Sequence, residues 1–169
     1  MESKKVSVLV PCKNPDMKYL RKCFDSIKSQ TVQPYEVIVL DNNSFNSSEI
    51  INLCTEYGFR YERREQDGIG FARAELAKLA TGDYIAFLSA DDVYLPNFIE
   101  EMLKETDKNP NTVLYCHYEV IDENDIIMKT FIANSYSDHV DFCISALQKA
   151  YENTMFVCFD CVLIPRKII

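Results

Sequence analysis

Hydrophobic and polar positions along this chain follow two alternating periods. Short runs of consecutive apolar and β-branched residues predict buried strands, and they occupy residues 6–11, 35–40, 59–63 and 83–88. Between these runs, apolar residues recur every three or four positions, which predicts helices over residues 17–29, 47–57, 69–80 and 96–108. Four strand-then-helix units predict an α/β fold, in which helices flank a mostly parallel sheet.

The pattern changes after residue 110. Residues 112–121 and 126–131 flank the polar segment Asp122–Asp125 and predict an antiparallel hairpin. Residues 139–151 have the spacing of an amphipathic helix, and residues 156–164 predict a last strand. We therefore expect residues 1–169 to form a single domain with a mixed carboxyl-terminal part.

Polar residues cluster directly after the predicted strands. The clusters are Pro11–Pro15, Asp41–Ser44, Asp67–Arg73 and Ser89–Asp92. Each has a simpler interpretation as a turn or a helix cap. However, parallel strands end at one edge of a sheet, and ligands bind beyond those ends. Independent caps need not all carry carboxylates and amides at the same edge, so the clusters predict one site.

The charge of the chain restricts what this site can bind. The net charge of −8, from 18 basic and 26 acidic residues, argues against a broad basic face for nucleic acid. A nucleoside diphosphate bound through a divalent cation fits better, because Asp91 and Asp92 supply the oxygen ligands that Mg²⁺ or Mn²⁺ prefers. Arg73 and Lys13 add local positive charge.

Several segments, in this order, resemble the family-two glycosyltransferases. They are VSVLVPCKN, the segment from YLRKCFDSIKSQ to DNNS, GIGFARA and GDYIAFLSADDVYLP, which together span about residues 6–108. The resemblance is weaker over residues 110–169, where CVLIPRKII resembles the strand after the family's acceptor-side helix. It implies a GT-A (Rossmann-like) fold, with residues 1–110 as the nucleotide-sugar half and residues 111–169 as part of the acceptor half.

The resemblance also implies roles for individual residues. Carried over position by position, it implies a nucleotide-sugar site of Pro11, Asn14, Asp41, Arg73, Ser89 and Asp91, with the metal on Asp91 and Asp92. In this transfer Asp41 contacts the base or the ribose. Ser89 stands where the family has the first Asp of its Asp-x-Asp motif, and Asn42 replaces the second Asp of an Asp-Asp pair. Metal affinity and donor choice depend on these departures.

The implied activity is a hexosyltransferase reaction. A sugar would pass with inversion, assisted by Mn²⁺ or Mg²⁺, from a UDP- or GDP-sugar to a hydroxyl of a glycan, lipid-linked or protein acceptor. Such a transfer needs a base to deprotonate the acceptor. In the family that base lies beyond the strand resembling Cys161–Ile169, so we expect it beyond Ile169, in a longer enzyme. The alternative is a nucleotide-sugar-binding module without a base.

A dinucleotide-dependent oxidoreductase is a third hypothesis, and the sequence argues against it. That class needs a glycine-rich fingerprint after the first strand. Cys12–Pro15 stand there instead.

Cysteines and hydropathy bear on location. The longest apolar run is five residues, whereas a transmembrane helix needs about 20. Seven cysteines, mostly in apolar runs, indicate a reducing cytoplasmic compartment. If the acceptor is lipid-linked, we expect the protein to contact a membrane peripherally. Cys158 and Cys161 have C-x-x-C spacing, but within one strand they would face opposite sides. We therefore expect no metal there.

Overall fold

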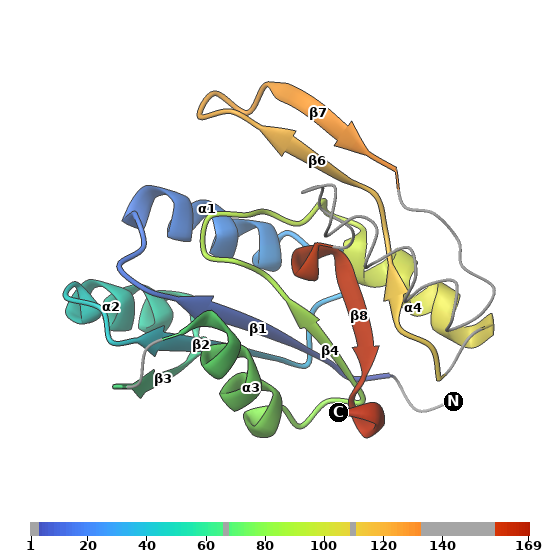
Figure 1. Cartoon of the computed structure of the whole chain (residues 1–169), viewed down its shortest axis with the longest axis horizontal. Helices are drawn as coiled ribbons and strands as arrows, with labels where there is room; N and C mark the ends of the chain where they lie inside the picture. Colours follow the sequence, from blue (N-terminus) through green and yellow to red (C-terminus); the bar gives the residue numbers. More distant parts are fainter. Residues whose placement is uncertain (1–3, 66–67, 109–110, 133–157) are drawn as a thin grey trace.

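The computed structural model describes residues 4–65, 68–108, 111–132 and 158–169 (Figure 1). The strands are β1 (Val6–Cys12), β2 (Glu36–Asn42), β3 (Arg60–Arg64), β4 (Tyr84–Phe87), β5 (Leu114–Tyr115), β6 (Tyr118–Ile121), β7 (Ile127–Phe131) and β8 (Val162–Pro165). The helices are α1 (Met17–Lys28), α2 (Ser47–Tyr57), α3 (Ile69–Leu79) and α4 (Phe98–Lys108), with 3-10 turns η1 (Phe159–Cys161) and η2 (Arg166–Ile168). The eight elements predicted before residue 110 are confirmed to within two residues at each end.

Six strands form one sheet in the order β3-β2-β1-β4-β8-β5. The pairs that join β1 to β2, β1 to β4 and β2 to β3 are parallel, whereas β8 runs antiparallel to β4 and to β5. The prediction of a mostly parallel sheet with a mixed carboxyl-terminal part is therefore confirmed. The carboxyl ends of β1, β2, β3 and β4 all lie at one edge of this sheet (Figure 1).

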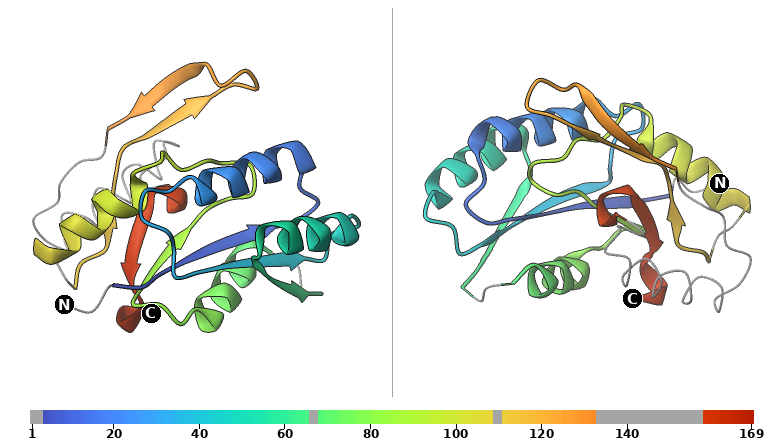
Figure 2. Two further views of the ribbon diagram at one scale, coloured as in Figure 1. Left: turned by 180° about the vertical axis from the view of Figure 1, so that it is seen from behind. Right: turned by 45° about the horizontal axis from the view of Figure 1, so that its top comes forward.

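Helices cover both faces of the sheet (Figure 2). Val8 and Val10 of β1 point to the face covered by α1, α2 and α4, where the ring of Phe24 is fully buried. Leu9, between them, points to the opposite face, where it packs with Leu76 of α3. Burial on both faces explains why β1 is an unbroken apolar run and not an alternating one.

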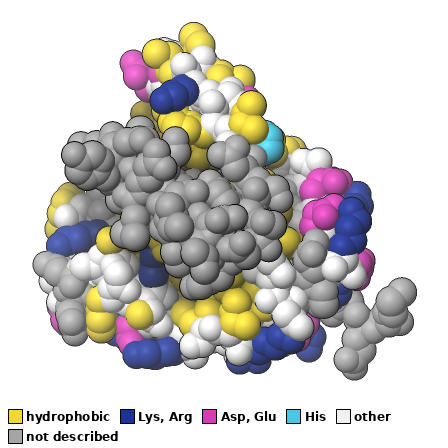
Figure 3. Space-filling view, turned by 45° about the vertical axis from the view of Figure 1, so that its right-hand side comes forward, with side chains coloured by type: hydrophobic (Ala, Val, Ile, Leu, Met, Phe, Trp, Pro, Cys, Tyr) yellow, Lys and Arg dark blue, Asp and Glu magenta, His cyan; other side chains and the backbone are white. Residues whose placement is uncertain are grey.

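The predicted hairpin after α4 is confirmed in part. The expected strand 112–121 is divided, because β5 joins the main sheet against β8 while β6 pairs with β7. The β6–β7 hairpin stands away from the sheet (Figure 1). Its apolar side chains include the exposed Val120 and Met128, and hydrophobic side chains are visible on the surface of the molecule (Figure 3). Near its tip, Lys22 Nζ of α1 pairs with the Asp125 carboxylate at 2.8 Å.

The predicted last strand, residues 156–164, begins outside the described residues and is wrong at residues 159–161. These residues form the turn η1, and the strand β8 follows it. The Cys161 backbone N–H donates to the Cys158 carbonyl at 3.2 Å, so the two cysteines flank a turn and do not share one extended strand. Within the described ranges no three His, Cys, Asp or Glu side chains are grouped to hold a metal ion.

Other expectations concern residues or properties that the structure treats only in part. The predicted helix over residues 139–151 lies outside the described residues, as does Asp67. Six cysteines are described, and all six are free thiols. Among the helices of the described part, none combines the length and apolar character needed to cross a bilayer.

Candidate functional site

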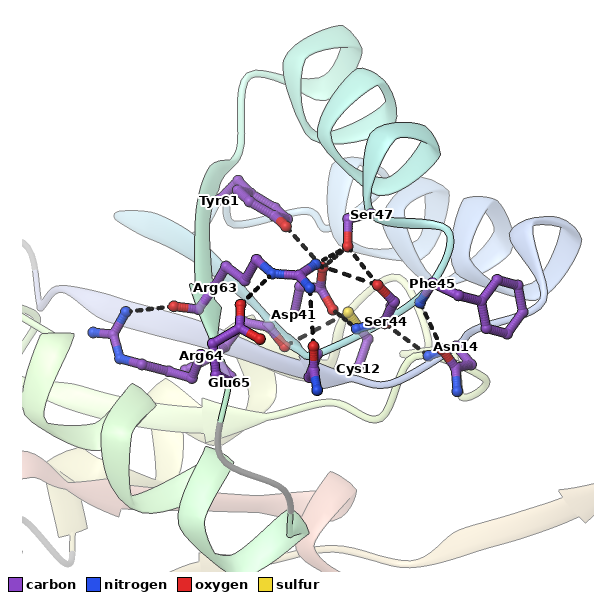
Figure 4. Close-up of polar contacts among 12 residues, drawn as sticks. Cys12, Asn14, Asp41, Ser44, Phe45, Ser47, Tyr61, Arg63, Arg64 and Glu65 are labelled. Atoms are coloured by element: carbon purple, nitrogen blue, oxygen red, sulfur yellow. Dashed lines mark hydrogen bonds and ion pairs between the residues drawn. The ribbon is translucent and has the colours of Figure 1, made fainter.

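Asp41 organises the loop that follows β2. Its side chain is 0% exposed. The carboxylate accepts hydrogen bonds from the Ser44 backbone N–H at 2.8 Å, from Ser47 Oγ at 2.6 Å and from the Tyr61 hydroxyl at 2.7 Å. Arg63 Nη1, which lies opposite Asp41 on β3, is 3.0 Å away (Figure 4). The loop between β2 and α2 is thus built around one buried carboxylate.

These contacts determine the charge of Asp41. Burial by itself raises the pKa of a carboxyl group, but hydrogen bonds from Ser44, Ser47 and Tyr61 outweigh it, and the pKa of Asp41 is lowered. Asp41 is therefore ionised at neutral pH, and protein donors meet both of its oxygens. Contact between Asp41 and a base or ribose stays a prediction.

Asn14 ties the end of β1 to the same loop. Its backbone N–H donates to Ser44 Oγ at 2.8 Å, and its Oδ1 accepts from the Phe45 backbone N–H at 3.0 Å (Figure 4). Asn14 has φ of +47°, a conformation that asparagine tolerates better than most residues. Pro11 is buried inside β1, whereas Asn14 is exposed at the edge. Of these two predicted site residues, Asn14 is the one that presents polar atoms at the surface.

The turn after β4 carries the predicted metal-binding residues. The Asp92 backbone N–H donates to the Ser89 carbonyl at 3.1 Å, and the Ser89 backbone N–H donates to the Asp160 carboxylate. Burial, together with the negative charges of Asp160 and Asp91, raises the pKa of Asp92 to about 6. The carboxylates of Asp160 and Asp91 are therefore near enough to act on Asp92 electrostatically.

Sequence reasoning did not place Asp160 in the site. Asp160 reaches the site because β8 runs antiparallel to β4, so that β8 starts at the edge where β4 ends. The direction of β8 could not be inferred from periodicity.

Arg73 lies in α3, which covers the sheet face opposite α1, α2 and α4. Its guanidinium lies 4.6 Å from the centre of the Phe159 ring. Within the described part of the chain, Arg73 Nε is buried without a hydrogen-bond partner. A buried donor without a partner is uncommon, which marks Arg73 as a candidate for contact with a ligand.

The predicted site residues fall into two groups. Asn14 and Asp41 are linked through Ser44. Ser89, Asp91 and Asp92 share the turn after β4, which Asp160 of η1 contacts at the Ser89 N–H, and the neighbouring Phe159 contacts Arg73. Both groups lie at the edge where β1, β2 and β4 end.

The residues fit a shared divalent cation better than a preformed metal centre. Carboxylates at Asp91 and Asp92 have the oxygen chemistry that Mg²⁺ or Mn²⁺ prefers, but the described residues hold no group of three ligands. A cation bound here would take its remaining ligands from diphosphate oxygens and water. Asp91 also lines a cavity of about 220 Å³ with Tyr19, Lys22 and the hairpin tip.

Comparison with known sequences identifies relatives. The pattern described as Glycosyl transferase family 2 matches residues 7–169. An uncharacterized glycosyltransferase of Rickettsia felis is 36% identical over 122 residues, which cover 70% of this chain and 20% of the relative. The putative glycosyltransferase EpsH of Bacillus subtilis is 30% identical over 144 residues, which cover 82% of this chain and 41% of EpsH. The chain thus spans less than half the length of these relatives.

Solved structures share the fold. S. aureus TarS 1-349 in complex with UDP-GlcNAc has a TM-score of 0.68 at 18% identity, over 97% of this chain and 46% of that one. TarS 1-349 in complex with UDP has a TM-score of 0.59 at 24% identity, over 66% of this chain and 35% of that one. At these identities the likeness concerns the fold, and the expected GT-A architecture is confirmed.

Proposed function

This chain belongs to glycosyl transferase family 2, and on that premise we propose that it binds a UDP- or GDP-sugar and transfers its hexose to an acceptor hydroxyl with inversion. The nucleotide-sugar lies at the edge where β1, β2, β3 and β4 end. Residues 1–110 form the nucleotide-sugar half, and residues 111–169 form part of the acceptor half.

One observation carries this proposal. Polar side chains from the ends of three parallel strands, and from the start of α3, converge on one edge of the sheet. Asn14, the Asp41 loop, Arg73 and the Ser89–Asp92 turn come from four separate parts of the chain. In open α/β sheets this edge is where ligands bind. The fold shared with TarS, whose structures contain UDP and UDP-GlcNAc, supports the same ligand class.

Each residue has a distinct part in the proposed site. Asn14 and the loop built on Asp41 contact the base or ribose, with Pro11 packed beneath them in β1. Arg73 offers its unpartnered Nε–H to the ligand, and Ser89 faces the ribose. Asp91 and Asp92 hold Mg²⁺ or Mn²⁺, which when bound neutralises the diphosphate and stabilises it as a leaving group.

The second candidate is a binding module that keeps this pocket and lacks a base. It is favoured by Ser89 at the first position of the expected Asp-x-Asp motif, because a hydroxyl holds a divalent cation more weakly than a carboxylate does.

Calorimetric titration tests the proposal. UDP and GDP are each titrated into the chain with and without Mn²⁺. We expect one of them to bind, with Mn²⁺ strengthening the interaction and Asp91→Ala abolishing the metal-dependent part. The matched control is Asp107→Ala, because Asp107 is an exposed carboxylate of α4 that pairs with Lys4 away from the site.

Two outcomes decide between the candidates. If neither nucleotide binds under any condition, the transferase and the binding module are both refuted. If binding occurs, release of free sugar or acceptor glycosylation from a UDP- or GDP-sugar supports the enzyme. Tight binding without turnover supports the binding module.

A further inference from the structure

The segment before β8 reaches the proposed site because of the direction of β8. Tyr84 pairs with Pro165, and Ile85 with Ile164, in an antiparallel register. Each step toward the carboxyl end of β4 is therefore a step toward the start of β8. The turn η1, directly before β8, consequently lies beside the end of β4, where the Ser89–Asp92 turn begins.

Asp160 of η1 contacts that turn through a backbone hydrogen bond. Its carboxylate accepts the Ser89 backbone N–H. Its other oxygen accepts from Cys158 Sγ at 3.3 Å. The turn itself is fixed to the sheet, because the Cys116 backbone N–H donates to the Cys161 carbonyl at 3.0 Å. Asp160 therefore links the conformation of the β4 turn to a rigid part of the fold.

Phe159 contacts the other side of the site. Its ring lies under the Arg73 guanidinium, 4.6 Å from ring centre to Cζ. The same ring meets Phe87, the last residue of β4, edge-on at 6.4 Å between centres. A guanidinium held against an aromatic face has fewer accessible rotamers, so Phe159 sets the place from which Arg73 donates.

We propose that Phe159 and Asp160 are positioning residues of the nucleotide-sugar site: Asp160 holds the Ser89–Asp92 turn, and Phe159 holds Arg73. The inference rests on the proposed function, since it assigns these two residues to the same site. One short turn thereby aligns the carboxylates that face the diphosphate with the arginine that faces it from α3.

The role of Asp160 follows from its hydrogen bond and not from its charge. The negative charge of Asp160 acts unfavourably on the Asp92 carboxylate, whereas its hydrogen bond with the Ser89 backbone N–H is favourable. What the Ser89 N–H requires is an acceptor oxygen. Asparagine supplies that oxygen without the charge, whereas alanine supplies neither.

Binding of Mn²⁺ with UDP, and separately with GDP, to the full chain measures this role. We expect Asp160→Ala to weaken binding by about tenfold, as for loss of a hydrogen bond from a charged group. The nucleotide affinity of Asp160→Asn should stay within about threefold of that of the parent chain. The matched control is Asp83→Ala, because Asp83 accepts a backbone N–H from Lys5 at 2.9 Å at the opposite edge of the sheet. It should lower stability and leave nucleotide affinity unchanged.

Phe159 is tested in parallel. Phe159→Ala should weaken binding by about fivefold, whereas Phe159→Tyr, which keeps the aromatic face, should bind as the parent does. Tyr35→Ala is the control, because the Tyr35 ring carries Lys5 Nζ at 4.8 Å away from the site. Thermal unfolding of every variant confirms that it is folded, and amide exchange at Ser89 reports its hydrogen bond directly.

The outcomes separate this inference from the proposed function. If the parent binds neither nucleotide, the proposed function is refuted and the inference falls with it. If the parent binds and Asp160→Ala binds equally well, only the positioning role is refuted. If Asp160→Asn is as weak as Asp160→Ala, the charge matters and Asp160 is a ligand or base. Should Asp160→Ala not fold, Asp160→Leu, which has about the branched shape of asparagine but no acceptor oxygen, takes its place in the comparison with Asp160→Asn.

Discussion

Replacing Asp41 by asparagine should destabilise the protein far more than a typical substitution at a strand end. The side chain is fully buried and accepts hydrogen bonds from Ser44, Ser47 and Tyr61 in addition to the ion pair with Arg63. Asparagine has one acceptor oxygen and one amide group, which is itself a donor. In either orientation the amide group therefore meets a donor, and no rotamer restores the network.

The magnitude follows from the less costly orientation. With the amide turned toward Ser44, one buried backbone N–H loses its partner, which costs about 1–3 kcal/mol. The bonds from Ser47 and Tyr61 remain but lose the charge, at about 1 kcal/mol each. Arg63 is partly exposed, so we give its ion pair little weight. The free energy of unfolding should fall by about 3–5 kcal/mol at neutral pH.

Equilibrium urea unfolding followed by far-UV circular dichroism measures this change, since the chain has no tryptophan. Ser47→Ala, which removes a single hydroxyl, is the comparison and should cost about 1 kcal/mol. Because the pKa of Asp41 is lowered in the folded protein, its ionised form contributes stability above the unfolded pKa of about 4. That contribution is lost as the pH falls through the folded value. Two results would refute this reasoning. One is a loss below about 1 kcal/mol in Asp41→Asn; the other is a difference in unfolding free energy between parent and variant that does not narrow in acid.

Three further substitutions and conditions test other parts of the structure. Gly82→Ala would place Cβ 2.7 Å from Ser7 Oγ and should destabilise by about 1–3 kcal/mol in thermal unfolding, whereas Gly70→Ala, with nothing within 4 Å, should not destabilise. Asp92 has a pKa raised to about 6, so the folded chain retains its proton above the unfolded pKa and stability declines as pH rises toward 6. Since a cation favours the ionised form, Mn²⁺-dependent nucleotide affinity should fall as pH drops below about 6, and calorimetry with Asp92→Asn should show no such dependence. Phe24→Ala removes a fully buried ring packed edge-on against two others and should cost about 3–5 kcal/mol by urea unfolding; a cost near 1 kcal/mol would contradict the packing described here.

Sequence periodicity determined the elements before residue 110. Consecutive apolar residues in β1 and spaced ones in α1 reflect which faces must be buried, and burial is encoded locally. The convergence of Asn14, Asp41 and Asp91 on one edge also followed from the sequence, because parallel strands necessarily end together. The segments that contain Asp41–Ser44 and Ser89–Asp92 resemble those of the family despite their departures, and the family model and the fold confirmed the family and its architecture.

Tertiary structure alone decided what surrounds those residues. Asp41 was predicted as a ligand contact, but its donors Tyr61 and Arg63 lie 20 and 22 residues away on β3, and no local pattern specifies them. Asp160 and Phe159 enter the site because β8 runs antiparallel to β4, a choice between two strand directions that hydrophobic periodicity does not record. The physical reason is the same in both cases. Periodicity reports which side of an element is buried, whereas the partners of a buried polar group depend on strand order and direction, which only the packed sheet establishes.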